Sequence, residues 1–153
     1  MMTQSLAGAF LRWQDEVLLL HRGMHKKITP GLWAGIGGHI EPDDASPYAA
    51  CLREIEEETG INAEQIERLD LRYFALCESE NTLDSIYYFA GVLTEKPLLR
   101  ETPEGQLHWI KLLDGLALPM SELMKALYTH WVSDPNGNSL HCFIDGNLKG
   151  RML

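Results

Sequence analysis

Apolar and polar positions in the first part of the chain alternate in short runs separated by turn residues. Residues 5–13 alternate weakly, residues 14–16 read Gln-Asp-Glu, and residues 17–21 form a second short apolar run. Two such runs on either side of a polar turn predict a β-hairpin. A loop over residues 23–31, containing glycine, lysine and proline, separates this hairpin from another short strand expected at 32–36.

The next segment has the features of a helix with clear ends. Asp43, Asp44 or Ser46 can cap its first turn, since short polar side chains accept hydrogen bonds from free backbone N–H groups. We predict a helix over residues 47–59, which begins at Pro47 because proline suits the first turn of a helix. Gly60 suits the left-handed residue that commonly follows a last helical turn.

The second half of the chain predicts more strands than helices. Runs rich in β-forming residues at 66–76 and 85–94 are separated by a polar turn, and residues 107–112 are a further strand candidate. An amphipathic pattern predicts a second helix from Pro119 to about residue 132. Residues 139–153 then predict a closing hairpin with a turn at Asp145-Gly146.

The order of these elements predicts an α/β fold. Strands on either side of one helix, with a second helix late in the chain, favour a mixed β-sheet sandwiched between helices. A length of 153 residues fits one domain with an ordinary core. We therefore expect a single domain over residues 1–153, with the hairpin at about 139–153 as an extension.

Charge and cysteine content narrow the classes of function. The net charge of −9 arises from 13 basic and 22 acidic residues, without a basic stripe. This balance argues against a polymeric nucleic acid as partner, but not against a nucleotide that brings its own magnesium. The three cysteines are isolated, which suggests neither a zinc site nor a disulfide framework. No signal peptide or membrane-spanning run is evident, so we expect a cytoplasmic protein with no membrane partner.

The predicted first helix carries an unusual group of carboxylates. Glu54, Glu57 and Glu58 stand at i, i+3 and i+4, which puts them on one helical face, where like charges repel. A hard divalent cation removes that repulsion, because Mg²⁺ takes oxygen ligands and favours a few carboxylates together with substrate phosphates. The pattern therefore predicts a magnesium site on this helix.

The segment from Gly38 to Ile61 resembles the Nudix box, whose pattern is G-x5-E-x7-R-E-U-x-E-E-x-G-U, with U an aliphatic residue. The matching positions are Gly38, Arg53, Glu54, Ile55, Glu57, Glu58, Gly60 and Ile61. Two departures occur: Asp44 replaces the first glutamate, and eight residues rather than seven separate it from Arg53. The resemblance implies the Nudix fold, an α/β/α sandwich with a mixed sheet, for residues 1–153.

The resemblance also implies roles for the box residues. Glu57 and Glu58 would be the first metal ligands, with Glu54 as a ligand or as the general base. The backbone carbonyl of Gly38 would be a further ligand. Arg53 would steer Glu54 and hold the loop by a salt bridge. The cofactor implied is Mg²⁺, with Mn²⁺ as a candidate substitute.

Four further positions are candidates outside the helix. Glu104 precedes a predicted strand at a position where MutT-like members place a glutamate, so Glu54 and Glu104 are both candidates for the general base. Arg22 would contact substrate phosphates, since its guanidinium suits bidentate contacts, although a surface charge is the alternative. Trp109 would stack on a nucleobase, although packing in the core is the alternative. His39 is the histidine expected near the site.

The function implied is hydrolysis of a phosphoanhydride bond in a nucleoside diphosphate linked to another group. Compact length, Trp109 and the Glu104 region favour a MutT-like nucleoside triphosphate pyrophosphohydrolase. Its substrates would include oxidised nucleotides such as 8-oxo-dGTP, and its products would be a monophosphate and pyrophosphate. An ADP-ribose or nucleotide-sugar pyrophosphatase is an alternative, although the sequence marks of ADP-ribose and dinucleoside polyphosphate hydrolases are not matched.

Three non-hydrolase interpretations carry less weight. A nucleotide-sensing module would usually lose the box carboxylates, which are retained here. An isopentenyl diphosphate isomerase needs a cysteine shortly after Trp33, where this chain has Gly35-Ile36-Gly37-Gly38. A structural protein with an incidental acidic helix would not require the box spacing. Similar proteins are often homodimers, and the sequence leaves the oligomeric state of this chain undecided.

Overall fold

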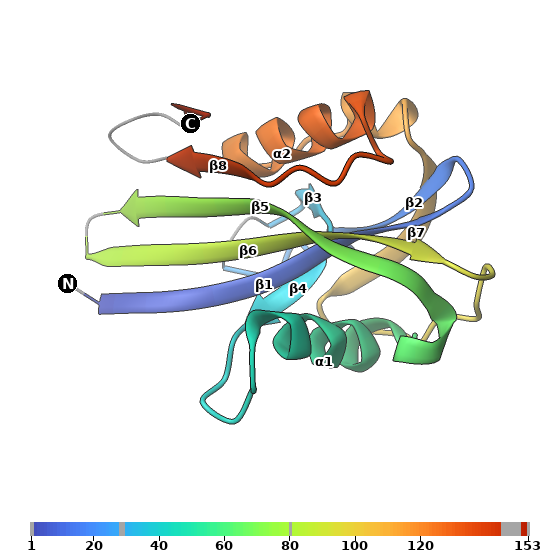
Figure 1. Cartoon of the computed structure of the whole chain (residues 1–153), viewed down its shortest axis with the longest axis horizontal. Helices are drawn as coiled ribbons and strands as arrows, with labels where there is room; N and C mark the ends of the chain where they lie inside the picture. Colours follow the sequence, from blue (N-terminus) through green and yellow to red (C-terminus); the bar gives the residue numbers. More distant parts are fainter. Residues whose placement is uncertain (1, 28–29, 80, 145–150, 153) are drawn as a thin grey trace.

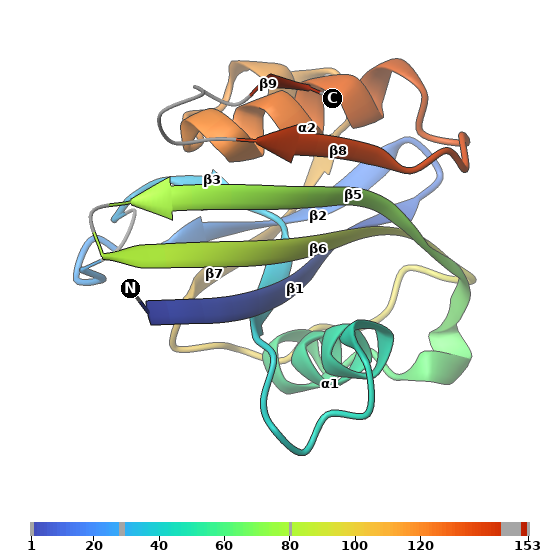
Figure 2. The ribbon, with the colours of Figure 1, turned by 60° about the vertical axis from the view of Figure 1, so that its left-hand side comes forward.

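The computed structural model describes residues 2–27, 30–79, 81–144 and 151–152. Within them, one mixed sheet carries nine strands in the order β3-β2-β1-β6-β5-β8-β9, with β4 paired to β1 and β7 paired to β2. Helix α1 lies against one face of this sheet and helix α2 lies against the other (Figures 1 and 2). The predicted α/β/α sandwich is confirmed.

The elements follow one another in a simple order. The strands are β1 (Met2–Trp13), β2 (Glu16–Arg22), β3 (Trp33–Ala34), β4 (Ile36–His39), β5 (Ile66–Ser79), β6 (Thr82–Leu93), β7 (Gly105–Lys111), β8 (His141–Ile144) and β9 (Arg151–Met152). The helices are α1 (Pro47–Thr59) and α2 (Glu122–Ser133), with short 3-10 turns η1 (Ala63–Gln65) and η2 (Asp114–Ala117).

Strand β1 is central to the sheet. It pairs antiparallel with β2 in the predicted hairpin and parallel with β6, from Met2 opposite Thr82 to Arg12 opposite Val92. It also pairs antiparallel with β4, so that Gly38 lies opposite Ala7. The start of the box is therefore part of the sheet and is held directly against its central strand.

Helix α1 has the ends that its sequence predicts. The side chain of Ser46 accepts a hydrogen bond from the N–H of Ala49 at 3.0 Å, and Gly60 adopts the left-handed conformation at φ 82°. The buried side chains Ala50, Cys51 and Ile55 face the sheet. Burial of this stripe fixes the rotation of the helix about its axis, and hence the direction of every charged side chain on it.

The α2 side of the sheet is an aromatic core. Phe10 of β1 stacks on Trp131 of α2, with ring centroids 4.9 Å apart, and Tyr128 meets the same phenylalanine edge-on. Trp131 and Leu127 are fully buried, as the stripe on the predicted second helix requires. Ser121 caps α2 by accepting a hydrogen bond from the N–H of Met124.

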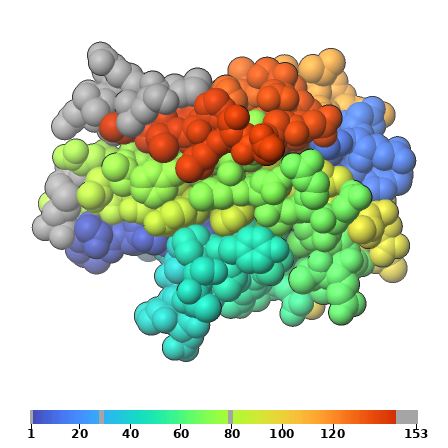
Figure 3. Space-filling model, in the orientation of Figure 1, coloured from blue at the N-terminus to red at the C-terminus, as the bar shows by residue number. Residues whose placement is uncertain are grey.

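The end of the chain extends the sheet. Strand β8 pairs parallel with β5 and antiparallel with β9, which gives the strand pairing of the predicted closing hairpin. The turn predicted at 145–146 lies outside the described residues. In the space-filling view, β8 and the residues just before it lie along β5 (Figure 3). Over the described residues, the structure has no helix of the length and apolar character that crossing a membrane requires.

Candidate active site

The carboxylates of α1 differ in direction because the helix rotation is fixed. Glu54 and Glu58 flank the buried stripe, and the Glu54 side chain is only 12% exposed. Glu57 lies about 100° further round the helix from Glu58, and its side chain is 58% exposed. Glu56, which is not a box position, is exposed to solvent. The three box glutamates therefore lie in two different environments.

A cavity of about 520 Å³ opens beside Glu54 and Glu58. Glutamates dominate its polar part, with Arg22 and His39 beside them; the acids are Glu41, Glu54, Glu58 and Glu104. Apolar side chains also line it, among them an apolar wall of Leu6, Ile86 and Met124 from β1, β6 and α2. The cavity thus combines acidic and apolar side chains, as a site for a charged group linked to a less polar one would.

Glu58 has the most unusual environment in this cavity. Its Oε2 atom is buried and has no hydrogen-bond partner among the described residues. Burial, followed by the negative charges of Glu54 and Glu104, raises its pKa to about 8. A buried carboxylate oxygen without a partner is costly, so this atom is suited to a cationic ligand.

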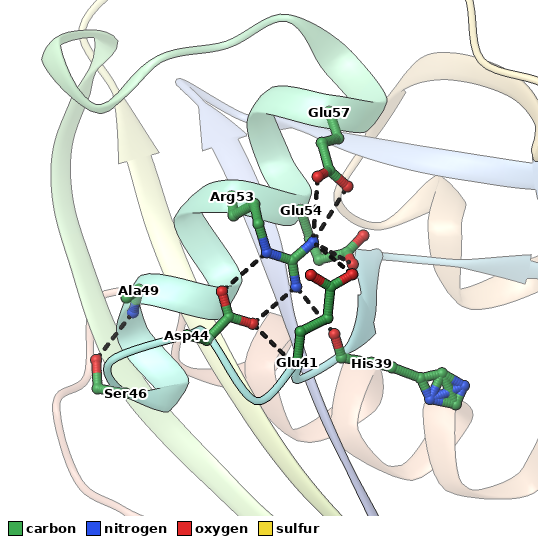
Figure 4. A network of polar contacts seen from close by, with 8 residues as sticks. All are labelled: His39, Glu41, Asp44, Ser46, Ala49, Arg53, Glu54 and Glu57. Atoms are coloured by element: carbon green, nitrogen blue, oxygen red, sulfur yellow. Dashed lines mark hydrogen bonds and ion pairs between the residues drawn. The ribbon is translucent and has the colours of Figure 1, made fainter.

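Arg53 organises the loop and helix around the site (Figure 4). Its guanidinium donates to Asp44 from two nitrogens, at 2.9 and 2.8 Å, and to the backbone oxygen of His39 at 3.0 Å. A third nitrogen donates to Glu54 at 3.1 Å and to Glu57 at 3.2 Å. These contacts raise the pKa of Arg53, with the Asp44 hydrogen bonds contributing most.

The geometry explains the departure of the box at Asp44. Its carboxylate binds Arg53 in the bidentate manner described above and also accepts a hydrogen bond from the N–H of Glu41 at 2.8 Å. The Arg53 hydrogen bonds hold the pKa of Asp44 at about 2. Asp44 therefore ties the loop to α1 through Arg53, while Asp44 itself lies outside the cavity lining.

Gly38 leaves room for the close approach of the Glu54 carboxylate. A Cβ atom at Gly38 would lie 2.6 Å from the carboxyl carbon of Glu54, so even a methyl group would displace that side chain. Burial raises the pKa of Glu54, and the hydrogen bond from Arg53 opposes this shift. The glycine of the box thus makes room for a carboxylate between β4 and α1.

Glu104 and Arg22 also line the cavity and lie close to each other. The Arg22 guanidinium lies 3.9 Å from Glu104, and the Lys26 ammonium lies 2.8 Å from the same carboxylate oxygen. Gly105 allows this approach: a Cβ there would lie 2.1 Å from the backbone oxygen of His21, and φ is 156°. The start of β7 can therefore lie directly against the end of β2.

The structure brings most of the predicted site residues together; Arg53 contacts Glu54 from outside the cavity lining, and two others lie apart from it. The cavity is lined by Gly38, His39, Glu54, Glu58, Glu104 and Arg22. Glu57 does not line it and instead lies in the Arg53 network, exposed to solvent. The exposed imidazole of His39 points away from Arg53 (Figure 4), whereas its backbone oxygen is held by it.

Trp109 is the second residue that lies apart from the cavity. It packs with Trp13 and other apolar residues in the core between the sheet and α1. The ammonium of Lys96 lies 5.5 Å from the centre of its ring and 5.6 Å from that of Trp13. Its position matches the core alternative that the sequence also allowed.

Two groups at the site were not among the sequence candidates. Glu41 lines the cavity, and its position three residues after Gly38 in the box loop was the available signal. The apolar wall formed by Leu6, Ile86 and Met124 had no local signal, because its members come from three separate elements.

The donor set fits a hard divalent cation. Glu54 and Glu58 bring two carboxylates to the cavity from adjacent turns of α1, and Glu58 offers an oxygen that no described residue satisfies. Mg²⁺ prefers such a small set of carboxylates together with oxygens from substrate or water. Within the described residues, no group of three or more histidine, cysteine or acidic side chains is placed to hold a metal ion by itself.

Comparison with known proteins identifies the family. The family model described as the NUDIX domain matches residues 2–131. The chain belongs to the Nudix family. Members of that family act on pyrophosphate bonds and generally use a divalent metal. The match ends within α2, so β8 and β9 lie beyond it.

Solved Nudix structures share the fold over nearly the whole chain. The MutT protein from Bacillus halodurans superposes with a TM-score of 0.72 at 25% identity, covering 97% of each chain. The NUDIX domain of Shewanella oneidensis NrtR, solved in complex with ADP-ribose, gives a TM-score of 0.73 at 18% identity, covering 89% of this chain and 90% of that one.

A curated sequence relative matches over a shorter region. The uncharacterized Nudix hydrolase NudL of Enterobacter sp. (strain 638) is 43% identical over 56 residues. That alignment spans 37% of this chain and 29% of the relative. The similarity therefore covers less than a third of the relative's length.

Proposed function

We propose that the chain is a Mg²⁺-dependent Nudix pyrophosphohydrolase that cleaves a phosphoanhydride bond in a nucleoside diphosphate linked to another group. Its main substrates would be nucleoside triphosphates, including oxidised ones such as 8-oxo-dGTP, cleaved to a monophosphate and pyrophosphate. The observation that carries this proposal is the buried, unpartnered oxygen of Glu58 beside Glu54, in a cavity that also contains Arg22 and Glu104.

The proposed roles follow from position in the cavity. Glu54, Glu58 and the backbone carbonyl of Gly38 would hold the cation. Bound there, Mg²⁺ would supply charge stabilisation for the phosphate oxygens and the leaving phosphate. Arg22 would contact a phosphate, because its guanidinium can make bidentate contacts. Arg53 would keep Glu54 in place through their 3.1 Å contact.

Either of two carboxylates can serve as the base for the attacking water. Glu54 lies next to Glu58 on α1, whereas Glu104 enters from the start of β7. Arg22 and Lys26 lie against Oε2 of Glu104, so this oxygen must be released before it can accept a proton. The apolar wall would contact the nucleoside, and Trp109 has no part in the proposal.

Product analysis with a panel of diphosphate compounds tests the function. The panel contains normal and oxidised nucleoside triphosphates, ADP-ribose, nucleotide sugars and dinucleoside polyphosphates. Each is incubated with Mg²⁺, with Mn²⁺ or with a chelator. We expect monophosphate and pyrophosphate from the triphosphates, lost with the chelator and in an identically purified Glu58→Gln variant.

The other outcomes assign the alternatives. Turnover confined to ADP-ribose or nucleotide sugars would replace the triphosphate assignment with that of a nucleotide-sugar type pyrophosphatase. Nucleotide binding without turnover of any compound would indicate a sensing module. If turnover persists in the Glu58→Gln variant, the buried oxygen of Glu58 has no role in catalysis, and the proposal loses its main support.

A further inference from the structure

Lys26 is a cation beside the cavity that lies outside the box motif. Its ammonium is 2.8 Å from Oε2 of Glu104, and its side chain is 26% exposed. The neighbouring Lys27 is exposed to solvent. Two adjacent lysines that look equivalent in the sequence thus occupy different places, and one of them points towards the site.

The backbone fixes Lys26 relative to Glu104. The N–H of Lys26 donates to the oxygen of Gly23 at 3.2 Å, and the N–H of Gly23 donates to the oxygen of Glu104 at 3.2 Å. Strands β2 and β7 pair alongside, with Arg22 opposite Gly105. Arg22, at the end of β2, and Lys26, in the turn that follows, therefore both approach one carboxylate oxygen of Glu104.

The contact between Lys26 and Glu104 is easily exchanged. Both side chains are partly exposed, and ion pairs of this kind contribute little net stability. Four glutamates line the cavity, so an incoming phosphate chain needs cations to offset their repulsion. A phosphate offers more charge and more acceptor oxygens than one carboxylate, and it can therefore compete for the ammonium.

We propose that Lys26 is a second phosphate-binding residue, which leaves Glu104 and contacts the phosphate chain together with Arg22 when a substrate enters. This inference rests on the proposed function, because it assumes a diphosphate or triphosphate substrate. The exchange has a further consequence: it frees the Glu104 carboxylate, which lines the same cavity as Glu58. Substrate entry and release of Glu104 would thus be one event.

A binding experiment with a double-mutant cycle tests the exchange. The probe is a non-hydrolysable α,β-imido nucleoside triphosphate with Mg²⁺, measured by calorimetry. The proteins are the wild type, Lys26→Ala, Lys26→Arg, Glu104→Gln and the Lys26→Ala/Glu104→Gln double variant, with Lys27→Ala as the matched control. Thermal melts establish that each variant is folded.

We expect Lys26→Ala to weaken binding roughly tenfold, the loss of one charge-assisted contact, both alone and in the Glu104→Gln background. Lys26→Arg should restore binding, and Lys27→Ala should leave it unchanged. An effect that disappears in the Glu104→Gln background would overturn the proposal, since Lys26 would then act only through Glu104. Equal weakening by Lys27→Ala would overturn it as well, because general charge would explain both.

Inorganic pyrophosphate with Mg²⁺ is the second probe and separates the two proposals. If pyrophosphate binding is weakened by Lys26→Ala while no nucleotide is turned over, the proposed function fails and the role of Lys26 stands. If nucleotides are turned over normally and KM is unchanged in Lys26→Ala, the role of Lys26 fails alone. If the wild type binds neither the nucleotide analogue nor pyrophosphate, both proposals are overturned.

Discussion

Two buried charged side chains on opposite sides of the sheet have opposite surroundings. Arg72 of β5 is 1% exposed, and its guanidinium donates to the backbone oxygens of Asp134 and Ser139 in the segment that joins α2 to β8. Glu58 of α1 is also largely buried, yet one of its oxygens has no partner among the described residues, and its charged neighbours are mostly acidic.

The difference separates a structural charge from a ligand-binding one. Arg72 meets carbonyl oxygens that need donors, so its burial ties the C-terminal segment to the sheet. Glu58 meets other carboxylates, so burial raises the free energy of its ionised form. Such strain is tolerated where a ligand relieves it, and strongly shifted pKa values therefore cluster at functional sites.

The largest expected effect comes from substituting Glu58, and the neighbouring Glu57 serves as its control. The two variants test whether the buried carboxylate is the one that binds a ligand. Glu58→Gln should lower kcat about 10²–10³-fold, because it removes a ligand of the cation that would stabilise charge on the phosphate oxygens. The same variant should bind Mg²⁺ more weakly, as measured by calorimetry on the substrate-free protein. Glu57→Gln is the matched control, since it makes the same chemical change at an exposed position on the same helix.

The control decides which carboxylate is the ligand. We expect Glu57→Gln to change kcat by less than about tenfold, since its side chain contacts Arg53 and lies outside the cavity. If Glu57→Gln is the more damaging change, the conformation of α1 seen here would not be the one that binds the metal, and the sequence-based ranking of Glu57 would hold.

Arg72→Ala should affect stability and leave chemistry alone. The change removes the donors of two backbone oxygens and opens a gap beneath the C-terminal segment, so we expect a loss of about 3 kcal/mol in the free energy of unfolding. Urea unfolding measures this loss, and kcat under stabilising conditions should equal that of the wild type. A fall in kcat with unchanged stability would show that the C-terminal segment acts on the site.

Local sequence signals predicted the elements and most of the acidic site. Ser46, Pro47 and Gly60 mark the ends of α1 through local hydrogen bonding and backbone preference, which need no tertiary contact. The box then places Gly38 and Glu54 together, because the spacing along one strand and one helix is nearly fixed. These features are encoded over short stretches, and the sequence therefore reveals them.

Features that depend on side-chain direction or on distant elements could not be predicted. The box pattern treats Glu57 and Glu58 alike, and only the burial of Ile55 against the sheet shows which of them turns inward. Trp109 packs against the core cluster between the sheet and α1 and lies outside the cavity lining, a place that depends on residues from several elements. Lys26 and Glu104 are 78 positions apart in the chain and meet only because β2 pairs with β7.

The smallest expected effect concerns the pH dependence of stability without metal. The pKa of Glu58 is raised to about 8 in the folded protein, from an ordinary 4.5. Below pH 4.5 Glu58 is protonated in both the folded and the unfolded state, so it contributes nothing to the pH dependence of stability. Between about 4.5 and 8 the folded state binds more protons than the unfolded state, so its stability falls as the pH rises.

Thermal melts in chelator from pH 5 to pH 8.5 measure this slope. His130, whose pKa is lowered by burial, contributes in the opposite sense near neutral pH, so the relevant quantity is the difference between the wild type and Glu58→Gln. We expect the wild-type Tm to fall relative to the variant by more than about 3 °C over that range. Saturating Mg²⁺ should remove most of the difference, because a cation stabilises the ionised carboxylate. A constant difference across the range would mean that Glu58 ionises normally in the folded protein, and the contrast with Arg72 would then be one of geometry alone.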